Sequence, residues 1–360
     1  MEKDDQKIRV VCAMSGGVDS AVAACLLAKA GFDAIGVFMK FWVDDLCSGE
    51  KPRANLCCSG DAQRRAALTC AKLGIPFYIK DFSQEFKNGV VDNFIEGSKK
   101  GLTPNPCAVC NKVIKFGCLL EFTRELGASY LATGHYARTK LNKAGLVELL
   151  KGKDREKDQS YYLWQLGQKE LAKIIFPLGG FSKTEVRALA RELALPSSET
   201  PESQEVCFAP GGTDGFLSKR FAARPGDIAD ISGKKIGTHD GLWHYTIGQR
   251  KGIGLSGGPY YVISKNGKAN VLTVSKDRSD LLEKTVCLGG VNWTSGISPK
   301  LPLAVKAKIR SRSKAAMAQV RRKKDRVCLE FSRAQPAITS GQSAVFYVGS
   351  RLVGGGYITL

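Results

Sequence analysis

Ser15-Gly16-Gly17-Val18-Asp19-Ser20 joins an apolar run typical of a buried strand, Ile8 to Met14, to one typical of a helix, Ala21 to Leu27. The two glycines let the backbone approach an anion, the serines add hydroxyl donors, and amides at a helix start carry partial positive charge. Asp19 would repel phosphate unless both share a Mg²⁺ ion. The stretch therefore predicts a nucleotide-binding turn, with a plain strand-to-helix turn as the alternative.

This turn differs from two widespread phosphate loops. It lacks the Gly-Lys-Ser/Thr ending of the Walker loop and the Gly-x-Gly-x-x-Gly pattern of dinucleotide-binding folds. It resembles the PP-loop of the ATP pyrophosphatases. That resemblance implies that ATP is cleaved between its α and β phosphates and that AMP activates a carbonyl oxygen as a leaving group. We therefore expect adenylation followed by substitution.

Length and composition indicate a multidomain enzyme. The 360 residues suggest two or three domains, and a hydrophobic content of 43% is enough for real cores. No membrane span is visible, and the mixed-charge start followed by a short apolar run does not fit a signal peptide. We expect a cytoplasmic protein. In a reducing compartment, the 12 cysteines are expected to be catalytic or metal-binding rather than a disulfide scaffold.

The formal net charge of +20 predicts a polyanionic partner, because nucleic acid releases counterions when it meets a basic surface. One segment alternates basic and apolar residues, as a strand with one basic face would. Its basic members are Lys306, Lys308, Arg310, Arg312 and Lys314, and its apolar members are Val305, Ala307 and Ile309. A second basic run, Arg321 to Lys324, follows. Nucleic acid is the expected partner, with an exposed hairpin as the alternative.

The first part of the chain alternates strand-like and helix-like segments. Expected strands are 8–14, 33–39, 76–79 and 130–133; expected helices are 21–27, one that Asp61 caps and Gly74 ends, and 113–126. Repeated βα units predict a parallel sheet covered on both faces. Ligands of such sheets bind beyond the carboxyl ends of the strands, where the loop 15–20, Met39 and Gly134-His135 would converge.

The rest of the chain changes character. Ser182 to Glu185 forms a capping box, and Pro196 closes the helix that follows. From about Pro225 strands dominate, with Asn266-Gly267 as a hairpin turn and closing strands at 344–348 and 352–358. The sequence predicts an α/β protein with a parallel-sheet domain at 1–165, a small central domain at 166–224 and a C-terminal β-barrel at 225–360.

Three cysteine sites carry candidate chemistry. In Thr103-Pro104-Asn105-Pro106-Cys107-Ala108-Val109-Cys110-Asn111-Lys112, two prolines stiffen a loop with two thiols. Cys110 is expected near the start of the next helix, where the dipole and Lys112 would favour its thiolate. Cys207 lies in a segment too polar for a core strand. A lone cysteine is usually structural, whereas Cys-x-x-Cys in such a loop favours function. Cys57-Cys58 either binds something or simply precedes a helix.

Taken together, these motifs resemble one family almost from end to end, the tRNA-specific 2-thiouridylases known as MnmA or TrmU. The resemblance implies a Rossmann-like PP-loop domain of the adenine nucleotide alpha hydrolase type, a small central domain and a C-terminal β-barrel. The motifs occur in the family's order: Ser15 to Ser20, Cys57-Cys58-Ser59, Leu73 to Pro76, Thr103 to Phe116, Gly134-His135-Tyr136, Lys157 to Tyr161, Glu202 to Phe208 and Gly248 to Gly252.

The resemblance also implies a mechanism. ATP, with Mg²⁺, adenylates the C2 oxygen of the wobble uridine in tRNAs, expected to be the Lys, Glu and Gln acceptors. Cys207 corresponds to the cysteine that carries a persulfide, and Cys110 to its partner. The sulfur attacks C2 and AMP leaves, which gives 2-thiouridine. A cysteine desulfurase or a sulfur relay protein would supply the persulfide.

The same resemblance assigns binding residues position by position. Without it, His135 would be taken for an ordinary, hydrogen-bonded histidine. The implied ATP contacts are Ala13, Met14, Ser15, Gly16, Gly17, Val18, Asp19, Ser20, Met39 and Gly134. The implied tRNA contacts are Asn105, Pro106, Cys107, His135, Lys157, Asp158, Gln159, Arg310, Ser311 and Gln342.

One position departs from the family pattern. Many members carry Asp, thought to act as an acid/base, where this chain has Cys107. With Cys110 and Cys207, this residue makes a three-thiolate set similar to that of iron-sulfur tRNA thiolases, in which a fourth iron site stays open for sulfide. Thiolates select iron-sulfur clusters or zinc over harder metals. A labile iron-sulfur cluster is therefore the alternative to a persulfide relay.

Two functions of other classes stay open. A PP-loop synthetase that forms amides on a small carbonyl substrate would need neither the basic surface nor the distant cysteine pair. A non-catalytic RNA-binding protein would need neither Asp19 nor the thiols. Consumption of ATP that depends on tRNA would separate all three.

Overall fold

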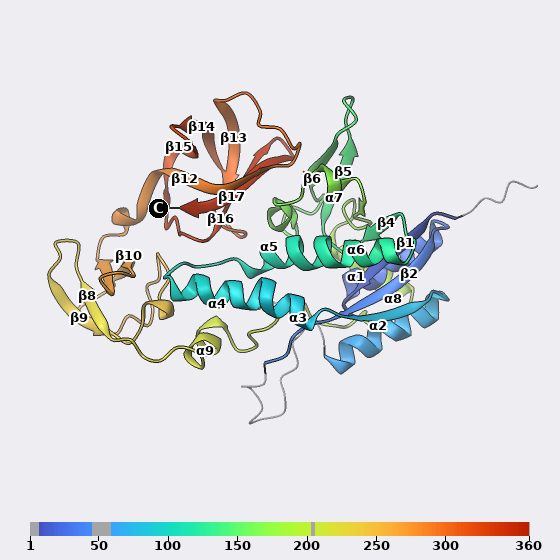
Figure 1. The fold of residues 1–360 in the computed structure, drawn as a ribbon, viewed down its shortest axis with the longest axis horizontal. Coiled ribbons are helices and arrows are strands. Elements are labelled where there is room, and N and C mark those ends of the chain that lie inside the picture. The colour runs from blue at the N-terminus through green and yellow to red at the C-terminus, as the bar shows by residue number, and fades with distance from the viewer. Residues whose placement is uncertain (1–6, 45–58, 203–205, 360) are drawn as a thin grey trace, which may run out of the picture.

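A five-stranded parallel sheet forms the first part of the molecule (Figure 1). The structure, a computed structural model, describes residues 7–44, 59–202 and 206–359, so Cys57 and Cys58 lie outside the described residues. The strand order is β3-β2-β1-β4-β7, and every pairing is parallel. The strands are β1 (Arg9–Met14), β2 (Asp33–Lys40), β3 (Phe77–Asp81), β4 (Tyr130–Ala132) and β7 (Ile174–Ile175).

Both faces of this sheet are covered, as the sequence predicts. Because side chains alternate along a strand, Val10 and Cys12 of β1 face one core and Val11 faces another. The first core includes residues of α1 (Val18–Lys29) and α2 (Gly60–Leu73). The second includes residues of α3 (Ser83–Phe86), α4 (Asp92–Lys99), α5 (Pro106–Cys110) and α6 (Leu119–Glu125), with π-helical turns at Lys87–Val91 and Asn111–Cys118.

Two helix boundaries differ from expectation. The α2 helix is capped by Ser59, whose Oγ accepts from the Ala62 amide at 3.2 Å, rather than by Asp61, which lies in the first turn. Gly74 ends it in the left-handed region at φ +65°, as predicted. The helix expected at 113–126 begins at Pro106, because proline fits the first helical position and Asn105 caps it.

The segment that begins at Gln168 extends the parallel sheet. It holds α7 (Gln168–Leu171) and β7, which pairs with β4. It also holds α8 (Lys183–Glu192), which starts with the predicted capping box and packs Val186 and Ala190 against Val18 and Val22 of α1. Within a stretch expected to form a central domain, residues 174–175 thus join the sheet of the first part, and α8 packs on its helix α1. The short helix α9 (Thr213–Ser218) follows.

The strands after Pro225 form two sheets rather than one barrel. The first has the order β10-β11-β8-β9, with β8 (Gly226–Ala229), β9 (Lys235–His239), β10 (Tyr261–Asn266) and β11 (Val271–Ser275). The predicted hairpin at Asn266-Gly267 is confirmed: Asn266 Oδ1 accepts from the amides of Lys268 and Ala269 at 3.1 and 3.0 Å. A 3₁₀ turn at Arg278–Leu281 separates this sheet from the next.

The second sheet is the predicted C-terminal barrel, and it closes through a pairing of β12 with β17. Its strands are β12 (Leu282–Trp293), β13 (Leu303–Lys308), β14 (Ala316–Lys323), β15 (Arg326–Pro336), β16 (Ser343–Val348) and β17 (Arg351–Thr359). In β13, Val305 and Ala307 are buried and Lys306 is exposed, as expected. The strand itself ends at Lys308 and a turn follows at 310–313, but Ile309 is still buried and Arg310, Arg312 and Lys314 are exposed.

The barrel is joined to the first part through shared hydrogen bonds. The hairpin of β5 (Ala137–Leu141) and β6 (Val147–Lys151) adds to the edge of the barrel sheet, where Leu149 and Leu150 pair with Leu352 and Arg351 of β17. The indole of Trp164 donates to Ser343 Oγ at 3.0 Å. Parts far apart in sequence therefore form one connected body.

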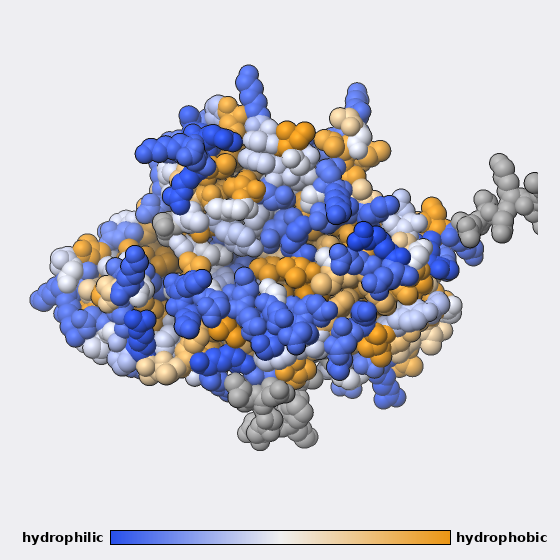
Figure 2. All heavy atoms as spheres, viewed as in Figure 1, coloured by the Kyte–Doolittle hydropathy of each residue, from blue (hydrophilic) through white to orange (hydrophobic). Residues whose placement is uncertain are grey.

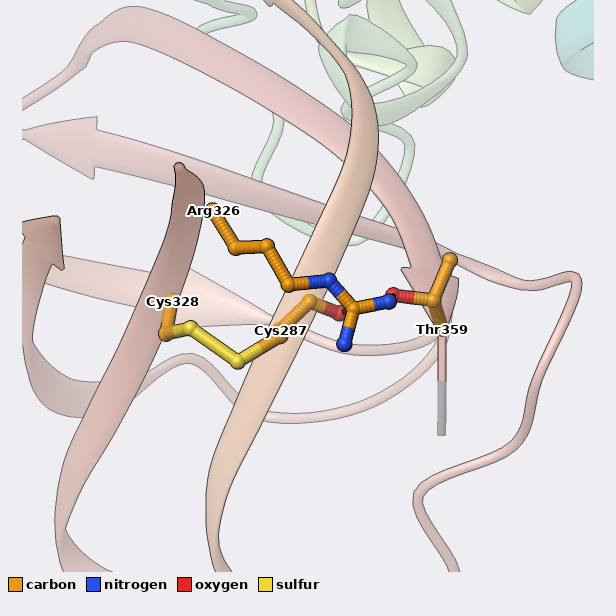
Figure 3. The surroundings of a disulfide bond; sticks show 4 residues. All are labelled: Cys287, Arg326, Cys328 and Thr359. Carbon is orange, nitrogen blue, oxygen red and sulfur yellow. Dashed lines mark hydrogen bonds between the residues drawn. A yellow bond between two sulfur atoms is a disulfide. The ribbon is translucent and has the colours of Figure 1, made fainter. Parts of the chain in front are cut away.

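A disulfide between Cys287 and Cys328 links β12 and β15 at directly opposed positions (Figure 3). Beside it, Arg326 donates to Thr359 Oγ1 at 3.4 Å, and Thr359 donates to the Cys287 carbonyl at 3.2 Å. Neither cysteine belongs to the three sites for which catalysis or metal binding was considered. The pairing depends on strand register across 41 residues, which no local pattern encodes.

Candidate active site

The loop 15–20 lies at the carboxyl end of β1, as predicted. Gly16 adopts φ +70°, and a Cβ there would overlap the carbonyl of Ala62, so glycine is required. Ser20 Oγ accepts from the Ser15 amide at 3.2 Å and donates to the Gly17 carbonyl at 3.0 Å. Gly17 gives α1 no side-chain cap. The amides of the first turn are therefore available to an anion.

One of the other implied ATP contacts, Gly134, meets this loop. A Cβ on Gly134 would lie 2.8 Å from the backbone carbon of Asp19 and 2.9 Å from the Ser20 amide nitrogen, so the end of β4 touches the loop directly. Met39 lies near the end of β2 beside β1. Ala13 and Met14 are buried in β1, which pairs with β2 at these positions.

Asp19 belongs to a chain of charged and polar groups. The Tyr136 hydroxyl donates to Asp19 Oδ1 at 2.7 Å, and Lys183 Nζ donates to the two carboxylate oxygens at 2.6 and 2.8 Å. Lys183 Nζ also lies 3.3 Å from Glu202, to which Lys157 Nζ donates at 2.7 Å. These residues come from five separate segments that the fold brings together.

The electrostatics of this chain keep its members in fixed protonation states. The hydrogen bond from Lys157, with the nearby charge of Lys183, lowers the pKa of Glu202. Burial and the neighbouring Asp19 carboxylate raise the pKa of Tyr136 far above its usual range. Glu202 is therefore an anion and Tyr136 a hydrogen-bond donor at neutral pH.

The Cys-x-x-Cys segment is helical rather than a loop ahead of a helix. Asn105 Oδ1 accepts from the Ala108 amide at 3.3 Å and caps α5. Cys107 is thus in the first turn and exposed, whereas Cys110 is half-buried at the end of α5. The expected helix start beside Cys110 is wrong, since the helix begins four residues earlier. Lys112, expected to act on Cys110, donates to Glu170 at 2.7 Å.

Cys110 and Cys207 contact the same apolar core on the second face of the sheet. Both are half-buried. Phe208, next to Cys207, packs edge to face on Phe94 of α4 with ring centroids 5.5 Å apart. The core thus fixes the chain on the carboxyl side of Cys207, while Ser203 to Glu205 lie outside the described residues.

The described residues do not fit an iron-sulfur cluster. Within 7–44, 59–202 and 206–359, there is no group of three or more His, Cys, Asp or Glu side chains that could hold a metal ion. Cys107, Cys110 and Cys207 are therefore not gathered as ligands. Asp19 is a carboxylate suited to Mg²⁺ in company with phosphate oxygens, which is how Mg²⁺ is usually held.

Gln342, one of the implied tRNA contacts, holds the cysteine segment to the barrel. Gln342 Nε2 donates to the Thr103 carbonyl at 2.8 Å, and the Thr103 amide donates to the Ser340 carbonyl at 3.0 Å. Ser311 forms a hydrogen bond with Tyr162. Burial raises the pKa of Tyr162, and the charge of Cys107 acts in the same direction. The turn that contains Arg310 and Ser311 thus contacts Tyr162.

The remaining implied tRNA contacts have partners inside the protein. Asp158 accepts from the amides of Gly152 and Ser160, and Gln159 Oε1 accepts from the Tyr136 amide at 3.0 Å. His135 is buried, and its Nδ1 lies 2.8 Å from Thr133 Oγ1. Burial lowers its pKa well below the usual range. This matches the expectation drawn without the family resemblance, a hydrogen-bonded core histidine.

Basic side chains gather where the first part meets the barrel. Lys151 Nζ lies 4.0 Å from the Tyr347 ring centroid, and Lys308 Nζ lies 5.9 Å from that of Tyr161. Burial lowers the pKa of Lys151, and the charges of Lys308 and Lys306 act in the same direction. Figure 2 shows hydrophilic residues over much of the barrel lobe, with smaller apolar patches between them.

Three residues of this site were missed as functional candidates. Lys183 was noticed only as part of a capping box, and Lys151 and Tyr162 carried no distinguishing local pattern. Lys183 meets Asp19 across 164 residues of sequence, so only the tertiary fold could reveal the pair.

Comparison with known proteins matches the whole length of the chain. Models described as a tRNA methyl transferase HUP domain, a tRNA methyl transferase PRC-barrel domain and an aminomethyltransferase beta-barrel domain match residues 8–211, 214–276 and 283–358. The tRNA-specific 2-thiouridylase MnmA of Roseiflexus castenholzii is 41% identical over 97% of this chain and 99% of its own length. The chain belongs to the tRNA-specific 2-thiouridylase family. The MnmA proteins of Thermus thermophilus and Thermoanaerobacter pseudethanolicus, the latter named MnmA 2, are 42% and 45% identical over 97% of this chain and 94% and 97% of their own.

Likeness to solved structures is weaker. A 4-thiouridine synthetase in complex with RNA and bound ATP is 20% identical, with a TM-score of 0.35, and covers 57% of this chain and 46% of its own. For this thiouridylase-family chain, the first model includes Cys207, and the division at 276–283 coincides with the 3₁₀ turn between the two sheets. Within the described residues, no helix combines the length and apolar character needed to cross a bilayer.

Proposed function

We propose that the protein is a tRNA 2-thiouridine synthase, a sulfurtransferase that uses ATP to replace the C2 oxygen of a wobble uridine with sulfur. The observation that carries this proposal is the position of the segment 103–110. It is bonded to the basic barrel through Gln342, and it contacts the core of the domain that holds the Asp19 loop. A nucleotide loop, two thiols and a basic surface thus belong to one connected body.

The first step is adenylation. The amides of the first turn of α1 and the exposed Ser15 hydroxyl would meet the ATP phosphates, while the buried Ser20 hydroxyl holds the turn through its bonds to Ser15 and Gly17. Asp19 would hold Mg²⁺, which supplies positive charge to the phosphates when bound. The C2 oxygen of uridine attacks the α phosphorus, the bond to the β phosphate breaks, and pyrophosphate leaves. The C2 oxygen then carries AMP, a good leaving group.

The second step transfers sulfur. The terminal sulfur of a persulfide on Cys207 attacks C2, and AMP leaves with the former C2 oxygen. The Cys110 thiolate then attacks Sγ of Cys207, which breaks the sulfur–sulfur bond and releases 2-thiouridine. The two cysteines are left as a disulfide, which a cellular dithiol reduces. A cysteine desulfurase or sulfur relay protein reloads Cys207.

Substitution of Cys107 with Asp separates this relay from an iron-sulfur mechanism. Because the relay uses only Cys110 and Cys207, the Cys107→Asp protein should keep its thiolation rate within about threefold of wild type, a free-energy change below 1 kcal/mol. The measurement is 2-thiouridine per enzyme after anaerobic incubation, with Cys118→Asp as a matched control for a helical thiol. Abolished activity in Cys107→Asp alone would instead make Cys107 a ligand.

The test of the proposed reaction class is the release of AMP from ATP. We expect AMP and pyrophosphate only when unmodified tRNA is present, with the Lys, Glu and Gln acceptors as substrates. AMP release that a small carbonyl compound stimulates and tRNA does not would indicate an amide-forming synthetase. Binding of tRNA without any ATP turnover would indicate a non-catalytic RNA-binding protein.

A further inference from the structure

Lys183 connects two segments that the proposed reaction uses separately. Its ammonium group donates to both oxygens of Asp19 in the nucleotide loop and lies 3.3 Å from Glu202. The Lys183 side chain is only 10% exposed, against 34% for Asp19 and 26% for Glu202. The ammonium is thus shared between two carboxylates, and a change in the charge around one of them alters its interaction with the other.

The backbone holds Lys183 firmly in this place. Lys183 is the first residue of α8, and its amide donates to Asp154 Oδ2 at 2.9 Å. Val186 and Ala190 of α8 pack against α1, the helix that begins at the nucleotide loop. The stem of Lys183 therefore stays beside Asp19, and its ammonium group is the part that can change partners.

Glu202 leads directly to the segment of Cys207. Its carboxylate is held by Lys157 at 2.7 Å as well as by Lys183, and Arg187 lies 4.0 Å away. Five residues further along, Cys207 contacts the core beside Phe208. The chain that carries the thiol is thus tied, on its amino-terminal side, to the lysine that also binds Asp19.

We propose that Lys183 is a positioning residue that couples occupancy of the nucleotide loop to the reactivity of Cys207. When Mg-ATP arrives, Asp19 is shared with Mg²⁺ and the phosphates offer the ammonium group new anionic partners. The electrostatic attraction between Lys183 and Glu202 then differs between the empty loop and the loop that holds Mg-ATP. This inference rests on the proposed function, because it takes Mg-ATP as the ligand and Cys207 as the reacting thiol.

The experiment measures the alkylation rate of Cys207 by iodoacetamide, followed by peptide mass spectrometry, with and without saturating Mg-ATP. In wild type we expect Mg-ATP to change the rate by about threefold or more, since a modest change in local opening free energy suffices. Glu202→Gln should lose that response, and its Kd for Mg-ATP should shift by a factor similar to the response it loses, because coupling between two sites is reciprocal. Glu199→Gln is the control, because it removes a nearby exposed ion pair, with Arg191.

A second variant tests the lysine itself. Lys183→Met should abolish the response and weaken Mg-ATP binding by about tenfold, since an anion-binding charge is lost. The same substitution should weaken the binding of AMP, which lacks the β and γ phosphates, less than the binding of ATP. If Lys183→Met does not fold, as its thermal melt would show, Glu202→Gln carries the test alone.

The outcomes distinguish the inference from the proposed function. A Glu202→Gln protein whose Cys207 responds to Mg-ATP as in wild type overturns the coupling. So does a wild-type protein that forms 2-thiouridine while its Cys207 is indifferent to Mg-ATP. A wild-type protein that neither binds nor consumes ATP overturns the proposed function itself.

Discussion

Gly134 shows how a single residue can shape the nucleotide site. A methyl group on Gly134 would meet the backbone of Asp19 and Ser20 at 2.8 and 2.9 Å, whereas one on Gly180 would meet nothing within 4 Å. Because backbone cannot yield as a flexible side chain can, Gly134→Ala should displace the loop 15–20. We expect about tenfold weaker Mg-ATP binding by calorimetry, or about 1.4 kcal/mol. Gly180→Ala serves as the control, and an unchanged Kd in Gly134→Ala would show that the loop is not the nucleotide site.

At this scale the sequence predicted residues whose chemistry is local and missed those whose chemistry is not. The placement of Ser15 to Ser20 followed from adjacent residues, because glycines, hydroxyls and a helix start act within one turn. Lys183 had no such signal, because its partner Asp19 lies on another element. The prediction that Asp61 caps α2 was wrong because Ser59, two residues earlier, supplies the capping oxygen.

At the scale of elements, the barrel fixes the cysteine segment through Gln342. Its side chain donates to the Thr103 carbonyl at 2.8 Å. Gln342→Ala should slow 2-thiouridine formation by about tenfold, because a small misplacement of reacting groups is costly. The Kd for Mg-ATP should stay unchanged. Gln335→Ala is the control, since Gln335 bonds only to the neighbouring carbonyls of Arg333 and Ala334. Equal rates for the two variants would show that the barrel does not position this segment.

A lysine on β10 predicts a pH dependence of stability. Burial lowers the pKa of Lys265 to about 8, and its ammonium donates to the Tyr245 carbonyl. Its proton leaves the folded state at lower pH than the unfolded state, so its contribution to stability rises between about pH 8 and 10.5. The unfolding free energy of wild type should rise by about 2 kcal/mol more than that of Lys265→Met across this range. This figure is smaller than the full pKa shift would give, because the side chain is partly exposed. Denaturant titrations at several pH values measure it, and a constant difference between the two proteins would contradict the shift.

Element types were easier to predict than their partners. The parallel sheet and the hairpin at Asn266 followed from short-range patterns. The division of the C-terminal strands into two sheets, the addition of β6 to β17 and the disulfide between β12 and β15 depend on register between distant segments. Period-two alternation identifies a strand but not its neighbour.

At the scale of the whole molecule, the basic surface predicts salt-dependent binding of tRNA. Lys306 on β13 and Arg322 on β14 are exposed on the barrel. Replacing either with Gln should lower the slope of log Kd against log salt by about 1 if that residue neutralises one phosphate. Lys29→Gln is the control, because Lys29 lies at the end of α1 opposite the loop. Equal slopes for all variants would place the RNA on another face.

We propose that this chain makes 2-thiouridine through Cys110 and Cys207. The most direct measurement is mass spectrometry of tRNA after anaerobically purified protein meets unmodified tRNA, Mg-ATP and a persulfide donor, before and after iron chelation. The relay predicts 2-thiouridine that survives chelation and is lost in Cys110→Ser and Cys207→Ser. Product that disappears on chelation and returns with cluster reconstitution would contradict the relay, and no product under either condition would contradict the thiolation itself.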